Sequence, residues 1–120
     1  MNSEELKART KQFALRVMKL VGALPRTTVG RAIGGQLVRS GTSVGANYRA
    51  AGRARSKAEF AAKLGTVEEE ADETCFWLES IIAGQLLPEK RVAALLEEAD
   101  ALTAIFTSAV RTSKLGKNRR

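Results

Sequence analysis

The sequence predicts an all-α protein, an antiparallel up-down-up-down four-helix bundle. Apolar residues recur at spacings of three, four and seven through most of the 120 residues, and alternation typical of strands never persists. Capping residues, glycines and prolines divide this pattern into four segments with short connections, as in simple bundles. We expect one domain, a bundle over residues 1–113, followed by a basic, frayed tail over residues 114–120.

The first helix is predicted to begin after Ser3 and to end near Pro25. Ser3 is a suitable N-cap, and Glu4 and Glu5 place negative charge at the positive end of the helix dipole. A proline disfavours helical geometry in the residue before it, which sets the other boundary. One apolar stripe follows at helical spacing: Leu6, Phe13, Val17, Leu20 and Leu24.

The second helix is predicted to run from a cap at Thr27 or Thr28 to about Arg53. Six glycines fall between residues 30 and 52, and each one inside a helix costs about 1 kcal/mol relative to alanine. Propensity alone therefore favours a loop or two short helices. We expect one continuous helix, because small residues at this spacing let two backbones approach closely. Its apolar stripe is Ile33, Leu37, Val44 and Ala51.

The third and fourth helices have clearer boundaries. Ser56 and Glu59 form a capping box that opens the third helix, and Gly84 ends it. Pro88 suits the first turn of the fourth helix. The third helix carries Phe60, Leu64, Val67, Ala71, Cys75, Leu78 and Ile82, and the fourth carries Val92, Leu95, Leu96, Ala99, Leu102, Ile105, Phe106 and Val110.

Composition excludes several classes of function. The chain has no histidine, which removes histidine acid–base catalysis and histidine-liganded metals, and its one cysteine cannot form an intrachain disulfide. We expect Cys75 to be a small core residue in a reducing cytosol. No apolar run approaches the roughly 20 residues of a membrane span, and the N-terminus lacks a signal-peptide pattern. We therefore expect a cytoplasmic protein without a metal, cofactor, membrane contact or small-molecule substrate.

Charge is distributed very unevenly along the chain. Residues 1–58 hold 12 basic and 2 acidic side chains, whereas residues 59–110 hold 3 basic and 11 acidic ones. The last ten residues add five basic side chains, and the formal net charge is +7. The first two helices are thus basic, and the last two are acidic outside the core.

Two interpretations of this asymmetry compete, and ordinary solvated faces are a third. In the first, a basic surface binds phosphates. In the second, the oppositely charged halves attract each other within or between chains and drive assembly. No base-reading element is present, so nucleic acid would be held by backbone contacts that weaken with salt. The residues predicted to bind nucleic acid are Arg39, Arg49, Arg53, Arg55, Lys57, Lys117, Arg119 and Arg120.

Polar residues also share faces of the second and third helices. They are Ser40, Ser43, Asn47 and Ala50 on the second helix, and Lys63, Glu70, Glu73 and Trp77 on the third. The favoured interpretation is interhelical hydrogen bonding that fixes register, with Arg39 or Arg49 paired to a carboxylate of the third helix. A polar binding site is the alternative, and catalysis is disfavoured because Ser43 has no histidine base.

Phe76 and Trp77 are adjacent, so their side chains point about 100° apart on the helix. Either one of them contacts another subunit, or both belong to a broad core. We predict an oligomer interface that contains Tyr48, Phe76 and Trp77.

Residues 36–49, QLVRSGTSVGANYR, closely resemble the signature of small bacterial four-helix-bundle proteins, the ribosomal RNA intervening-sequence proteins. The resemblance continues through SKAEF at residues 56–60 and through EADET and FWL between residues 70 and 78. The family's polar signature would include Ser43, Asn47, Ser56, Glu59, Lys63, Glu70 and Glu73. Family members often have an acidic residue where this chain has Ala50, Ala51 and Gly52, which makes the region more basic here.

The resemblance implies an antiparallel four-helix bundle that assembles into a homopentamer. A related group, the accessory variability proteins of diversity-generating retroelements, consists of basic pentamers that bind nucleic acid and a reverse transcriptase. We therefore predict a non-enzymatic homo-oligomer, expected to be a pentamer, that binds nucleic acid, with RNA the first expectation. The alternative is a structural or protein-adaptor oligomer whose charge asymmetry serves only assembly.

These hypotheses make different structural predictions. Binding requires Arg49, Arg53, Arg55, Lys57 and the C-terminal basic cluster to be exposed together on one surface. Assembly requires the same arginines to meet glutamates of a neighbouring copy, among Glu68, Glu69, Glu70 and Glu73.

Overall fold

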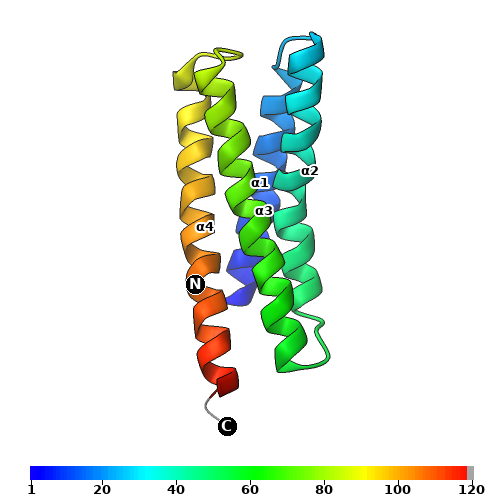
Figure 1. The fold of residues 1–120 in the computed structure, drawn as a ribbon, viewed down its shortest axis with the longest axis vertical. Helices are drawn as coiled ribbons and strands as arrows, with labels where there is room; N and C mark the ends of the chain where they lie inside the picture. The colour runs from blue at the N-terminus through cyan, green and yellow to red at the C-terminus, as the bar shows by residue number, and fades with distance from the viewer. Residues whose placement is uncertain (119–120) are drawn as a thin grey trace.

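Four helices form an antiparallel up-down-up-down bundle, which confirms the predicted fold class (Figure 1). The computed structural model describes the backbone of residues 1–118 and the side chains of residues 1–115. The bundle measures 52 × 23 × 19 Å along its principal axes. Its helices are α1 (Ser3–Gly22), α2 (Thr28–Ala51), α3 (Lys57–Ala83) and α4 (Glu89–Asn118).

Side-chain caps begin the first three helices. The N-cap of α1 is Asn2, not Ser3 as predicted, because the backbone of Asn2 is extended and its side chain accepts the Glu5 N–H at 2.8 Å. Thr27 caps α2 and Ser56 caps α3, as predicted. The capping box is only half formed, since the Glu59 carboxylate accepts the Arg55 N–H rather than that of Ser56.

The glycine-rich second helix is continuous, as predicted. Gly41 lies against Val17 of α1, where an added Cβ would come within 2.8 Å of both methyl groups. Gly45, one turn further along α2, packs less tightly on Thr10, where an added Cβ would lie 3.2 Å from the threonine hydroxyl oxygen. Close approach to α1 thus offsets the conformational cost of these glycines.

The connection between α3 and α4 turns through a left-handed residue. Gln85 has φ 57°, and the Leu86 N–H donates to the Ile81 carbonyl across the helix end. Pro88 immediately precedes α4, which continues past the boundary expected at residue 113 and ends at Asn118. Arg119, Arg120 and the side chain of Lys117 lie outside the described residues.

The apolar stripes of all four helices meet in one core, except that Phe60 at the start of α3 is exposed. Phe13 and Phe106 are the largest of its fully buried side chains. Cys75 is buried, as predicted, and Tyr48 packs at the edge of the core with its ring 5.4 Å from that of Phe106. No helix among the described residues is long and apolar enough to cross a membrane.

The close packing of α2 on α1 can be tested by adding a methyl group at a glycine in the contact. We expect Gly41→Ala to lower the free energy of unfolding by about 1–3 kcal/mol, because a methyl group there overpacks against a stiff valine. Gly35→Ala is the matched control. It faces open space and should raise stability by up to about 1 kcal/mol. Urea unfolding at one protein concentration measures both, and equal effects of the two variants would contradict the packing argument.

Candidate nucleic-acid interface

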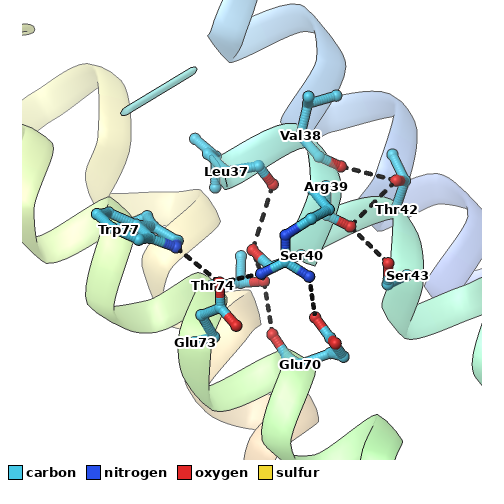
Figure 2. A network of polar contacts seen from close by, with 10 residues as sticks. All are labelled: Leu37, Val38, Arg39, Ser40, Thr42, Ser43, Glu70, Glu73, Thr74 and Trp77. Atoms are coloured by element: carbon cyan, nitrogen blue, oxygen red, sulfur yellow. Dashed lines mark hydrogen bonds and ion pairs between the residues drawn. The ribbon is translucent and has the colours of Figure 1, made fainter. Parts of the chain in front are cut away.

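A polar network joins α2 to α3 near the middle of the bundle (Figure 2). Arg39 of α2 donates to the carboxylates of Glu70, at 3.4 Å, and of Glu73 on α3. The Trp77 indole N–H donates to the same Glu73 carboxylate at 3.0 Å. One arginine and one indole therefore hold two neighbouring carboxylates on the outer side of the α2–α3 seam.

Beneath this network lies a fully buried hydroxyl pair. Ser40 and Thr74 hydrogen-bond each other at 2.9 Å across the seam, and each also contacts a carbonyl of its own helix. Because each hydroxyl keeps a carbonyl of its own helix, loss of the bond across the seam costs about 0.5–1.5 kcal/mol, the net contribution of one hydrogen bond. The pair therefore favours a single register of α2 against α3.

The network keeps its charged groups ionised. The indole hydrogen bond from Trp77, followed by that from Arg39, lowers the pKa of the Glu73 carboxyl. The hydrogen bond to Glu73 raises the pKa of Arg39. Arg39 is half-exposed, but its guanidinium is engaged by carboxylates of its own chain. Of the two arginines considered for this pairing, Arg39 makes it and Arg49 does not.

The side chains of Ser43 and Lys63 bond within their own helices. The Ser43 hydroxyl donates to the Arg39 carbonyl of its own helix at 2.6 Å, so it does not fix register by a bond to α3. Asn47 is half-buried on α2. Lys63 pairs with Glu59 at 3.9 Å, one turn earlier on α3, and lies outside the Arg39 network.

A basic end is formed by Arg49, Arg53, Arg55 and Lys57, where α2 passes into α3. All four side chains are exposed, and within the described part of the chain none forms an ion pair. They occupy the last turn of α2, the short connection and the first turn of α3. The antiparallel topology thus leaves four cations close together and facing solvent.

The C-terminal part of α4 lies at the same end of the molecule as the α2–α3 connection (Figure 1). It adds Arg111 and Lys114, both exposed, to that end of the bundle. Lys117, Arg119 and Arg120 were also predicted to bind nucleic acid, but the described side chains stop at Leu115.

The three aromatic residues predicted at an oligomer interface have different environments. Phe76 is 57% exposed. Trp77 is half-buried, meets the Phe76 ring edge-on at 4.9 Å and is hydrogen-bonded to Glu73. Tyr48 packs on Phe106 and its hydroxyl donates to Ser3 at 3.2 Å, so its contacts lie within its own chain.

Sequence reasoning missed two polar contacts of α4. Arg9 of α1 donates twice to Glu98, both at 2.7 Å, and the Thr107 hydroxyl donates to Glu68 at 2.6 Å. The sequence feature that could have predicted the Arg9–Glu98 pair is that the two residues have opposite charge and flank the apolar stripes of their helices. Their pairing depends on which helices are neighbours, which no single stripe specifies.

Neither the cysteine nor the acidic side chains described in the structure form a reactive or metal-binding group. Burial raises the pKa of the Cys75 thiol to about 11, so it is protonated at neutral pH and a poor nucleophile. Within the described residues, no three acidic or cysteine side chains converge in a way that would hold a metal ion.

Comparison with known proteins identifies the family. The model of the 23S rRNA-intervening sequence protein family matches residues 4–108. The chain belongs to this family. A solved structure from Bacteroides thetaiotaomicron, described as a protein of unknown function from the S23 ribosomal protein family, is similar with a TM-score of 0.84 and 30% identity. The match covers 92% of this chain and 99% of that one.

No match was found among curated proteins. The 23S rRNA-intervening sequence protein family is described without reference to an enzymatic activity. Membership therefore supports the bundle fold and leaves function to be argued from the surface of the molecule.

The Glu73 network predicts a specific dependence of stability on pH. Because the pKa of folded Glu73 lies below its unfolded value, its stabilisation is complete above the unfolded pKa and is lost as the pH falls through the folded one. We expect Glu73→Gln to lose less unfolding free energy than the wild type between about pH 5 and pH 3. Urea unfolding across that range measures the loss.

Glu69→Gln is the matched control for this experiment. It removes an exposed carboxylate from the same helix that forms no ion pair among the described side chains. It should retain the wild-type pH dependence. If Glu73→Gln and the wild type lost stability in parallel, Glu73 would not be held ionised by Trp77 and Arg39.

Proposed function

We propose that the protein is a non-enzymatic homo-oligomer that binds the backbone of nucleic acid through its basic end. One observation carries this proposal: four exposed cations lie within residues 49–57, and no carboxylate among the described side chains forms an ion pair with them. An unpaired cation cluster releases counterions from a phosphate backbone when it binds, which is the main source of sequence-independent affinity.

The form of this end favours phosphate contacts over base recognition. Arginine presents a planar fork of donors that matches a phosphate, and three of the four cations are arginines. They sit at helix ends and on a short connection rather than along one helix that could enter a major groove. The description of the family refers to 23S rRNA, which makes RNA the first ligand to test.

Oligomerisation is supported by a second feature of the surface. Phe76 projects from the outer side of α3, and Leu15 and Met18 are about half exposed on α1. Burying such side chains between copies gains roughly 25 cal/mol per Å² of apolar surface. A homopentamer remains the expected assembly on the strength of the family resemblance, and copies around a ring would repeat the basic end.

The alternative is a structural or protein-adaptor oligomer that does not bind nucleic acid. It is favoured by Glu69, Glu79 and Glu97, which are exposed on α3 and α4 and could meet the basic end of a neighbouring copy. In that arrangement the arginines would be buried in the interface. Their accessibility in the assembled protein separates the two functions.

Charge reversal at the basic end tests nucleic-acid binding. We expect an Arg49→Glu, Arg53→Glu, Arg55→Glu variant to lose at least tenfold in affinity for structured RNA and duplex DNA. If each arginine meets one phosphate, the slope of log K against log salt for duplex DNA should fall by about 3. Fluorescence anisotropy across a salt series measures both quantities, and light scattering checks that the oligomeric mass is retained.

The control reverses three exposed cations at the opposite end of the bundle: Arg26→Glu, Arg31→Glu and Lys90→Glu. It changes the net charge by the same amount and should retain most of the affinity. Equal losses of affinity in the two variants would mean that net charge, and not the basic end, determines binding. No binding by the wild type at low salt, where electrostatic attraction is strongest, would reject the function.

The exposed aromatic residue tests assembly. We expect Phe76→Glu to shift the mass in solution from a multiple of the chain mass towards the single chain of 12.9 kDa, because it places a charge in the proposed interface. Val29→Glu is the control, since Val29 is also 57% exposed but lies in the first turn of α2, where a carboxylate suits the helix dipole. Sedimentation equilibrium measures both, and an unchanged mass for Phe76→Glu would exclude this face.

A further inference from the structure

A groove runs between α1 and α4, away from the basic end. These two helices pack against each other less extensively than the other neighbouring pairs. The groove has a volume of about 310 Å³, at the lower end of the range for small-molecule sites. It is lined by Arg16, Lys19 and Leu20 of α1 and by Arg91, Ala94 and Leu95 of α4.

The rim of this groove is cationic and its floor is apolar. Arg16, Lys19 and Arg91 supply three positive charges, and among the described side chains none of them forms an ion pair. Leu20 and Leu95 are buried beneath them. The groove therefore combines unpaired charge with an apolar surface.

The carboxylate that could neutralise the rim is already engaged. Glu98 accepts both hydrogen bonds of Arg9, at 2.7 Å each, and this contact lowers the pKa of the Glu98 carboxyl. Arg16 contributes a weaker attraction to the same carboxylate. The structure shows no hydrogen bond or ion pair from Arg16 or Arg91 to Glu98 or to another described carboxylate, so their donors remain available to a ligand.

We propose that the α1–α4 groove binds a phosphate ester of mononucleotide size. The phosphate lies between Arg16, Lys19 and Arg91, and the less polar part of the ligand lies on Leu20, Ala94 and Leu95. Two guanidinium groups from different helices favour phosphate over a carboxylate, because they can engage separate oxygens of a dianion. The site is independent of the proposed function, which uses the other end of the bundle.

The test is a titration of the full chain with AMP, inorganic phosphate and adenosine, followed by NMR and calorimetry. We expect saturable AMP binding, weaker binding of inorganic phosphate and none of adenosine, with the largest amide shifts in the α1 and α4 segments that line the groove. A short single-stranded oligonucleotide forms a second arm. If it displaces AMP, the phosphate comes from nucleic acid as well as from free nucleotides.

Matched variants assign the binding to the groove. The double variant Arg16→Gln, Arg91→Gln should bind AMP with at least tenfold lower affinity. Arg26→Gln with Lys90→Gln removes the same charge from exposed positions near that end that do not line the groove, and should change affinity less than twofold. Circular dichroism and urea unfolding confirm that both variants are folded.

Three results would overturn the proposal: no saturable binding of AMP, equal loss in the two variant pairs, or amide shifts confined to the basic end. The variant reversed at Arg49, Arg53 and Arg55 distinguishes the two hypotheses. If it binds AMP normally but has lost nucleic acid, both hold. If the wild type binds nucleic acid but not AMP, only the proposed ligand site in the groove is rejected.

Discussion

The close packing of α2 on α1 is the constraint on which the other features of this bundle depend. At Gly41 there is no space for a Cβ beside Val17, and at Gly45 a Cβ would be tight against Thr10, so the two helices approach closely along this contact. This contact determines which side of α2 faces α1. A neighbouring side of the helix is then directed at α3, and it carries Ser40 and Arg39 to their partners.

The polar contacts of α2 with α3 act at two depths. The Ser40–Thr74 pair is sealed from solvent and penalises any shift of register, because the hydrogen bond across the seam would then be lost. Arg39, Glu73 and Trp77 lie nearer the surface, where ion pairs contribute little stability but orient their side chains. Their arrangement explains a conspicuous cluster of charged and aromatic residues without a ligand.

The same topology separates the cations into groups with different roles. Arg9 and Arg39 are held by carboxylates of neighbouring helices and act as structural residues. The cations at the end of α2 and the start of α3 are exposed, as are Lys19 and Arg91 beside the α1–α4 groove, where Arg16 is partly exposed. The net charge of +7 is therefore not a diffuse property but is concentrated where phosphate groups could be met.

Much of this protein follows from its sequence alone. Apolar spacing and caps such as Thr27 and Ser56 determine four helices, and short connections make them antiparallel, because these signals are local. The charge asymmetry located the basic end for the same reason. Only the tertiary structure decided which cations are used inside the fold: it paired Arg39 with α3 and Arg9 with Glu98, and left Arg49 to Lys57 exposed. Those outcomes depend on the rotation and register of whole helices, which are settled by contacts between residues distant in sequence.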